Sequence, residues 1–483
     1  MKKLLLLSAV LWSSSSYADL ESRVSELETN ALINPLRFGS EVVTRYDSIE
    51  RDRCVDGTSP QGFPVPCETI ESEKISVHRL KFRLNFEAKT SPKLSFYGRL
   101  SASKLMARLT GITAEDEAVG KTGEEQGGRN YSGSEMYLER AFFNYRLLDD
   151  LIFSAGRLPT VDGGPKHLTE GAPPMGTYPM LAYDAVLDGY ALTYGLGDFT
   201  FRGVYHPVSN LHRSDSSGGL AKQKLFLANM PDKNEIYVGM IDYTNRKIGF
   251  ARKLNVIFHY LTFEDFVFAD AGVPNTYSDL SMGYDSLVAY FELTNIARLG
   301  LNLGLTFHQT TMHSKGSFMN PSALVDSLRQ QGVPESEIKA RVEESLAQTP
   351  AVGVMTDKRD DSTSGMGTQM VVSYRLPVKA LKKPTVGLEY FSADKTYTFF
   401  NLFADDVAFM HSVRGGSSMH LFWSQPLDPN LKLRLGYITK EQKYQEGLII
   451  GSKPKTISEL RAGQSKTTLK DTSSVYFELN MVI

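Results

Sequence analysis

Apolar and polar residues alternate one by one in segment after segment of this 483-residue chain. In residues 79–87 every second side chain is Leu or Phe, and the side chains between them are Arg, Lys, Asn and Glu. Residues 301–308, 431–437 and 475–483 repeat the pattern. A period of two is that of a β-strand with one apolar face and one polar face. The chain is therefore predicted to be all-β.

Sixteen segments of this kind can be placed along the chain. They lie near 36–49, 74–88, 93–108, 135–148, 151–157, 186–195, 198–207, 234–245, 250–264, 282–294, 299–310, 364–376, 384–397, 416–425, 430–441 and 472–483. Beyond the N-terminus no run approaches the ~18 apolar residues of a membrane helix. This excludes a membrane protein built of several helices.

The connections between the segments alternate in length. Tight turns such as 149–150 and 426–429 follow even-numbered segments, whereas long polar connections such as 109–134, 208–233 and 311–363 follow odd-numbered ones. Short turns at one end and long loops at the other are typical of an outer-membrane β-barrel. An even strand count would place both chain ends on the short-turn, periplasmic side.

A soluble sandwich or propeller is the rival fold, because its strands alternate in the same way. Three features favour the barrel. One face of the strands is bulky and almost uninterruptedly apolar, while the other is richly charged. The 23 Tyr and 26 Phe residues are abundant enough for interfacial girdles. A sandwich gives no reason for connections that alternate regularly in length. Because lipid leaves no strand edge unpaired, the sheet must close. We predict a transmembrane antiparallel β-barrel of about 16 strands.

The N-terminus has the form of an export signal. Two lysines precede the apolar residues 4–12, and residues 16–18 (Ser-Tyr-Ala) have the small-x-small form of a cleavage site. Residues 1–18 are therefore predicted to be a signal peptide, with an uncleaved anchor as the alternative. The predicted location is the cell outer membrane of a Gram-negative bacterium.

The mature chain would begin with an apolar stripe at helical spacing. Residues 19–34 are predicted to form a short periplasmic helix or tether, with a trimeric coiled-coil stub as the alternative, and 35–483 to form the barrel. The 53 Lys and Arg residues nearly balance the 55 Asp and Glu residues in charge, so no nucleic-acid partner is expected.

Cys54 and Cys67 are the only two cysteines, and they flank a Pro/Gly-rich stretch. In an exported protein two nearby cysteines usually pair. We therefore predict a disulfide. A metal pair is the alternative, but no His or second Cys pair has zinc spacing, and no metal site or cofactor is predicted.

The chain resembles bacterial porins in its short turns, long loops, short helical start and alternating final strand. Within 153–195, the elements Gly-Arg-x-Pro, Gly-Gly-Pro, Pro-x-Gly and Asp-Gly resemble a family of uncharacterised bacterial outer-membrane proteins that is labelled as a domain of unknown function. Porins commonly end in an aromatic residue, whereas this chain ends in Ile483. Recognition by the barrel-assembly machinery, an expected partner, is therefore less secure.

About sixteen strands would leave water in the middle of the barrel, so the polar faces would line a channel. Those faces are rich in basic side chains, among them Arg79, Lys81, Arg83, Arg99, Arg140, Arg146, Lys432 and Arg434. The acids that can be placed there are fewer: Glu41, Asp47, Glu87, Glu389 and Glu478. Because side-chain rings set ion preference, we hypothesise a mild anion preference. A mixed lumen with compensating acids is the equal alternative.

Residues 158–186 follow the fifth segment, the position at which porins carry an inward-folded loop. Several prolines and glycines make this segment stiff and turn-rich. The resemblance implies a constriction loop in which charged side chains narrow the channel. The candidates are Asp162, Lys166, His167, Glu170 and Asp184. A surface loop packed over the rim is the alternative.

The long loop 311–363 is predicted to contain two helices, 322–331 and 335–348, because apolar residues recur there at helical spacing. This hairpin could cap or plug the mouth or bind a partner. A self-packed extracellular decoration is the simpler interpretation.

The chain contains no complete catalytic motif among those sought. The sequences HExxH, CxxC and GxSxG are absent, and the P-loop-like Gly120-Lys121-Thr122 lacks its first glycine, because Glu115 stands there. We therefore expect no enzyme. The leading hypothesis is a porin-like channel for small hydrophilic solutes, surrounded by outer-membrane lipid, with a homotrimer as one option. The alternative is a structural or adhesive barrel plugged by its loops.

Overall fold

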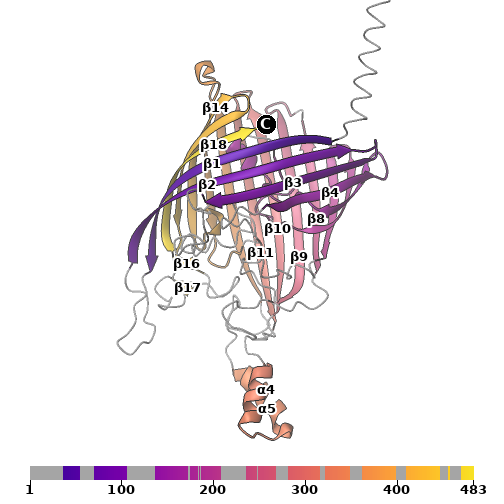
Figure 1. Cartoon of the computed structure of the whole chain (residues 1–483), viewed down its shortest axis with the longest axis vertical. Coiled ribbons are helices and arrows are strands. Elements are labelled where there is room, and N and C mark those ends of the chain that lie inside the picture. The colour runs from indigo at the N-terminus through magenta and orange to yellow at the C-terminus, as the bar shows by residue number, and fades with distance from the viewer. Residues whose placement is uncertain are drawn as a thin grey trace, which may run out of the picture.

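Sixteen antiparallel strands close into a single barrel (Figure 1). The computed structural model describes residues 36–54, 70–105, 136–171, 174–182, 184, 186–207, 235–246, 248–267, 281–315, 321–348, 362–398, 410–445, 455–456 and 469–483. Neighbours in the barrel follow the order of the chain, and β1 closes the sheet against β18 with Tyr46 opposite Phe477. The predicted fold class and strand number are confirmed.

Each predicted segment corresponds to one barrel strand. The strands are β1 (Leu36–Cys54), β2 (Ile70–Lys89), β3 (Leu94–Leu105), β4 (Tyr137–Arg146), β5 (Leu151–Arg157), β6 (Asp188–Leu196), β7 (Phe199–Pro207), β8 (Glu235–Asn245), β9 (Lys253–Val267), β10 (Ser281–Ile296), β11 (Leu301–Lys315), β12 (Ser362–Arg375), β13 (Thr385–Ala393), β14 (Gly416–Asp428), β15 (Leu431–Glu441) and β18 (Leu469–Val482). A two-stranded ribbon of β16 (Tyr444–Gln445) and β17 (Lys455–Thr456) lies outside the barrel sheet and was not predicted.

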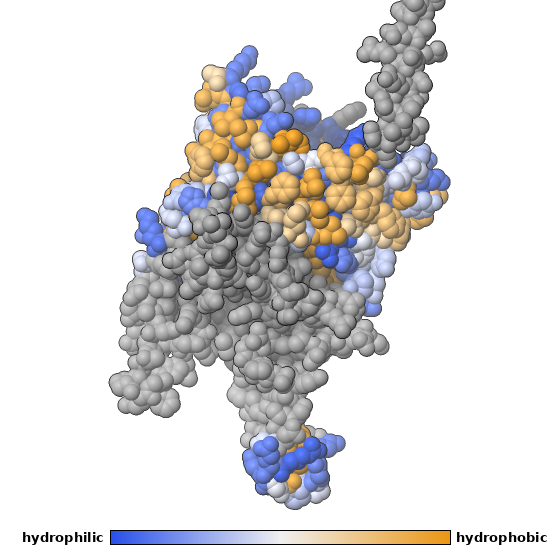
Figure 2. All heavy atoms as spheres, in the orientation of Figure 1, coloured by the Kyte–Doolittle hydropathy of each residue, from blue (hydrophilic) through white to orange (hydrophobic). Residues whose placement is uncertain are grey.

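Apolar side chains cover the outer wall. Tyr190, Phe258 and Leu421 are between 45% and 50% exposed, whereas Arg83 and Glu139, which occupy strands of the same barrel, are fully buried. Figure 2 shows apolar residues gathered over the strands and hydrophilic residues toward the short-turn end. A barrel that is surrounded by lipid requires this arrangement, with apolar side chains outside and ionised side chains inside.

The inner wall is not polar throughout, which corrects the expectation drawn from alternation. On β6 to β11 the inward side chains are mainly apolar, for example Val204, Ile236, Val238, Leu261 and Val288, all at most 5% exposed. We call this inner surface the apolar wall. The inner surface of β1, β2, β15 and β18, here called the charged wall, carries the buried Arg, Glu and Asp side chains instead.

The long β11–β12 connection contains two helices, α4 (Pro321–Gln330) and α5 (Glu335–Gln348). Leu328 and Ile338 are buried against each other, and Val325 and Val333 pack beside them. Figure 1 shows the pair beyond the loop end of the barrel, so these helices do not plug the lumen. Among the described residues, no helix combines the length and apolar character that crossing a bilayer requires.

Some predictions lie outside the described residues. These are the signal peptide 1–18, the helix or tether 19–34, and Cys67. Cys54 is the last residue of β1. The disulfide and the domain boundaries at the N-terminus therefore stay predictions. At the other end, Ile483 exchanges two 2.8 Å backbone hydrogen bonds with Ser40, so the final residue is held against β1.

Candidate functional site in the barrel lumen

The connection between β5 and β6, residues 158–187, folds into the barrel; we call it the inner loop. Leu158, Val161, Tyr178 and Ala182 are at most 3% exposed and pack on the apolar wall. The loop contains one short helix, α3 (Lys166–Glu170), which ends at Gly171 in the left-handed conformation at φ 59°. The structure therefore places the segment predicted as a constriction loop inside the lumen.

Polar contacts tie the inner loop to three sides of the lumen. Arg83 Nη2 on β2 donates to Asp162 Oδ2 at 2.6 Å, and His167 Nε2 lies 3.1 Å from Glu292 Oε2 on β10. On β15, Lys432 Nζ donates to the carbonyl oxygen of Gly171 at 2.8 Å. A loop that is held at three separated strands crosses the lumen rather than lining one wall.

Arg83 is the most heavily paired of these anchors. Its guanidinium lies 2.6 Å from Asp162, 3.1 Å from Glu41 and 3.4 Å from Glu139, and the side chain is fully buried. A buried charge is costly unless it is paired and hydrogen-bonded. The three carboxylates from β1, β4 and the inner loop meet that requirement.

A second segment also enters the lumen and was not predicted. Residues 394–398 and 410–415, between β13 and β14, form what we call the second inward segment, which includes the 3-10 turn η3 (Met410–Ser412). Tyr397, Met410 and Val413 are buried in one cluster with Met180 and Leu181 of the inner loop. The prediction was wrong in extending the thirteenth strand to residue 397, because the strand ends at Ala393.

Two glycines in β12 make room for this second inward segment. A Cβ atom on Gly365 would lie 2.3 Å from the backbone nitrogen of Tyr397, and one on Gly367 would lie 2.6 Å from its ring. Two successive positions of the inner face therefore lack a side chain there. That Gly-x-Gly spacing was a sequence sign of close approach, but it does not say which residue approaches.

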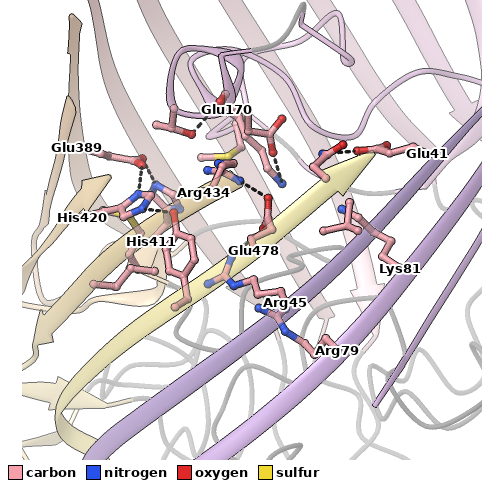
Figure 3. A pocket seen from close by; sticks show the side chains of 18 of the residues that line it. Glu41, Arg45, Arg79, Lys81, Glu170, Glu389, His411, His420, Arg434 and Glu478 are labelled. Carbon is pink, nitrogen blue, oxygen red and sulfur yellow. Dashed lines mark hydrogen bonds and ion pairs between the residues drawn. The ribbon is translucent and has the colours of Figure 1, made fainter. Parts of the chain in front are cut away.

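A cavity of about 90 Å³ remains between the inner loop and the charged wall (Figure 3). Its lining is strongly ionic and carries both signs. The basic residues are Arg45, Arg79, Lys81, Lys166 and Arg434, and the acidic ones are Glu41, Glu170, Asp184, Glu389 and Glu478. The inner loop contributes Lys166, Glu170 and Asp184, so three of the predicted constriction residues reach this cavity.

Ion pairs compensate much of the predicted basic wall. Asp47 accepts from Arg45 at 2.7 Å and from Arg79 at 2.8 Å, and Arg434 Nη1 donates to Glu478 Oε1 at 2.8 Å. Of the two interpretations that the sequence left open, these contacts match the lumen with compensating acids.

The remaining predicted basic residues lie elsewhere. Arg99 Nη1 donates to Glu139 Oε1 at 3.0 Å, and Arg140 Nη2 donates to the carbonyl oxygen of Val161 at 3.3 Å. Neither lines the cavity. Arg146 is exposed at the last position of β4, beside a short turn. The eight predicted residues therefore do not form one continuous surface.

Sequence reasoning missed a hydrogen-bonded cluster on the cavity wall. Glu389 Oε1 accepts from His411 Nε2 at 2.8 Å, and Glu389 Oε2 lies 3.4 Å from His420 Nδ1. His420 Nε2 lies 2.8 Å from the hydroxyl of Tyr476, and Gln369 Nε2 donates to Glu389 Oε1 at 2.6 Å. Figure 3 shows the three labelled residues of this cluster together on one side of the cavity. Strand register brings Glu389 and His420 together, and the inward turn of the β13–β14 connection adds His411; a sequence displays neither.

The ionisation of Glu170 is affected by its place in the inner loop. Burial raises the pKa of its carboxyl above the ordinary value, and the Lys166 ammonium, 4.0 Å away, opposes that rise. The loop therefore carries an acid that accepts a proton more readily than an exposed glutamate does.

A serine and a histidine meet elsewhere in the lumen. Ser286 Oγ lies 2.8 Å from His308 Nε2, and His308 Nδ1 lies 2.7 Å from the Tyr397 hydroxyl. Ser286 is 0% exposed and does not line the cavity, so a substrate has no access to it in this conformation. Among the described residues, no group of His, Cys, Asp and Glu has the geometry to hold a metal ion.

Comparison with known families gives one match. Residues 72–206 match the family described as a protein of unknown function (DUF3373). The match spans β2 to β7 and includes the inner loop, so it contains the stretch 153–195 in which the sequence resembled an uncharacterised family. That predicted resemblance is confirmed.

Several solved structures are similar to this chain in fold. OprB of Pseudomonas putida has 11% identity and a TM-score of 0.49, with 94% of this chain and 96% of that chain covered. OmpF of Salmonella typhi has 10% identity and a TM-score of 0.44, covering 92% and 97%. OmpT of Vibrio cholerae has 11% identity and a TM-score of 0.44, covering 93% and 97%. A search among curated proteins gave no match.

Proposed function

We propose that this chain is a porin-type channel of a Gram-negative outer membrane, through which small hydrophilic solutes diffuse passively. The observation that carries the proposal is the ionic cavity inside a closed barrel with an apolar outer wall. An inward loop narrows the lumen, and the space that it leaves is lined by charged groups rather than by the apolar wall. Such a path suits hydrated solutes and excludes lipids.

Selectivity in this proposal is weak and slightly favours anions. Five basic and five acidic side chains line the cavity, so their formal charges cancel. Burial raises the pKa of Glu170, so this carboxyl loses its negative charge more readily than an exposed glutamate does, which tips the balance toward positive charge. Charged linings of this kind set ion preference in channels.

A loop-plugged barrel is the second candidate, and one observation favours it. The inner loop and the second inward segment share an apolar cluster that includes Leu181 and Tyr397. Loops that are held by a packed core leave the lumen less readily than loops held by ion pairs alone. In that case the protein would act through its outer surface as a structural or adhesive barrel.

Planar bilayers containing the purified protein decide between the two candidates. A channel gives stepwise conductance of aqueous-pore size, and the reversal potential under a KCl gradient gives its ion preference. Membranes that stay silent would favour the plugged barrel. Deletion of residues 321–348, which form α4 and α5 outside the lumen, is the matched control and should leave the conductance unchanged.

The proposed partners follow from the same assignment. Outer-membrane lipid would surround the apolar outer surface of the barrel, and the barrel-assembly machinery would insert the chain. A homotrimer stays a prediction. Chemical crosslinking in outer-membrane vesicles, followed by gel electrophoresis without boiling, distinguishes a trimer from a monomer.

A further inference from the structure

The carboxylate of Glu389 stands between two imidazoles on the wall of the cavity. Its two oxygens face His411 Nε2 at 2.8 Å and His420 Nδ1 at 3.4 Å. An ionised carboxylate accepts hydrogen bonds and cannot donate them, so each facing ring nitrogen carries its proton. His420 Nε2 then accepts from the hydroxyl of Tyr476 at 2.8 Å. With one proton on each facing nitrogen and none on the other, both imidazoles are uncharged.

Protonation reverses the charge of this cluster. Glu389 with two neutral imidazoles carries a charge of −1, one added proton makes the cluster neutral, and a second makes it +1. Histidine is the side chain whose ordinary titration falls between about pH 5 and pH 8. His411 and His420 both line the cavity, so the change in charge takes place where a solute would pass.

We propose that His411 and His420 are the specificity-determining residues that make the ion preference of this channel depend on pH. The inference rests on the proposed channel function and deepens it. Each proton that this pair takes up adds one positive charge to a cavity whose formal charges otherwise cancel. The preference for anions therefore strengthens as the pH falls.

The charged neighbours fit this role. Arg434 on β15 is paired with Glu478 on β18 at 2.8 Å, and Arg45 on β1 lies 3.7 Å from the same Glu478. From the inner loop, Lys166, Glu170 and Asp184 face the same cavity. Burial raises the pKa of the Glu170 carboxyl, so this group also takes up a proton on acidification more readily than an exposed glutamate does, and the test must remove it.

The experiment measures reversal potentials under a KCl gradient at about pH 7.5 and about pH 5. All proteins carry Glu170→Gln, so that the histidines alone account for the change. We expect the chloride-to-potassium permeability ratio to rise about two- to threefold on acidification. His411→Gln together with His420→Gln should abolish that rise, and each single variant should remove about half of it.

Two further variants keep the outcome decisive. His313→Gln is the matched control, because His313 pairs with Asp285 on the outer face and its side chain is 42% exposed; it should retain the full rise. Glu389→Gln removes the negative charge and should increase anion preference already at about pH 7.5. Retention of the band shift between unboiled and boiled samples shows that each variant is folded.

The possible failures are distinguishable. A silent bilayer overturns the proposed channel and this inference together. A conducting protein whose double variant keeps the whole pH-dependent rise overturns the inference alone. A rise that His313→Gln also abolishes points to a general effect of acid on the barrel and overturns it as well.

Discussion

The two walls of the lumen hold the inner loop by different physical means. Against the apolar wall, Leu158, Val161 and Ala182 pack among buried side chains of β6 to β11 as in a protein core. Against the charged wall, the loop is held by ion pairs such as that between Asp162 and Arg83. Hydrophobic packing is short-ranged and insensitive to salt, whereas pairing depends on charge state.

Because the loop is held differently on the two sides, the two walls have different roles. Packing against the apolar wall fixes the inner loop on that side of the lumen. The charged wall keeps a cavity because ionised side chains need polar partners at defined distances. The solute path and the pH response that we propose therefore belong to the side of the lumen that keeps the cavity, which includes Glu389, His411 and His420 beside the charged wall, whereas the apolar clusters hold the constriction in place.

The largest effect is expected from a charge placed in the apolar packing. Leu181 is 0% exposed in the cluster shared by the inner loop and the second inward segment. Leu181→Asp buries an unpaired carboxylate, which is unfavourable enough to release the loop. We expect a several-fold increase in single-channel conductance. Leu148→Asp, at a residue that is 61% exposed, should leave the conductance unchanged, and equal currents from both variants would contradict the assignment.

Breaking the ionic anchor should have the next largest effect. Arg83→Met leaves three carboxylates without their shared guanidinium, and loss of one partner from a buried pair costs about 3–5 kcal/mol. We expect a lower temperature for loss of the folded gel band and noisier open-channel current. Arg157→Met removes an ion pair at 2.8 Å whose Asp188 side chain is 61% exposed, and it should cost at most about 1 kcal/mol. Similar costs for the two variants would refute the buried anchor.

The sequence predicted the strands well because apolar side chains recur at every second position, as with Leu80, Phe82 and Leu84 of β2. It could not predict the apolar wall, since β8 reads Ile236, Val238 and Met240 on its inner face and Tyr237 and Ile241 on its outer face. When both faces are apolar, alternation no longer marks the side that meets lipid. Only the packing of the inner loop explains the inward set.

The residues that line the cavity were also predicted only in part. Arg79, Lys81 and Arg434 were found because they interrupt apolar residues on alternating strands, and the inner loop was found through its place in the strand order. Glu389 was also placed on a polar face, but its contacts with two histidines were not predicted, because it lies 22 residues from His411 and 31 from His420. Contacts of this kind depend on register and on where a loop turns inward, and local patterns do not encode either.

Substituting a glycine tests the second inward segment with a smaller perturbation. A Cβ on Gly367 would lie 2.6 Å from the ring of Tyr397. Gly367→Ala therefore displaces that ring from its position beside His308. We expect a modest rise in conductance and faster proteolysis within the β13–β14 connection. Gly203→Ala, where a Cβ would meet nothing within 4 Å, is the control. Unchanged proteolysis in Gly367→Ala would mean that the segment adapts without leaving the lumen.

The smallest effect concerns the ionisation of Glu170 in the cavity. Its folded-state pKa is raised by burial, so its contribution to stability is present below the unfolded pKa and is lost as the pH rises through the folded pKa. Glu170→Gln should therefore stabilise the folded barrel slightly near neutral pH and change nothing at acidic pH. Thermal loss of the unboiled gel band, measured at both pH values, checks this. Stabilisation that is larger in acid would reverse the sign and would mean that the pairing with Lys166 outweighs burial.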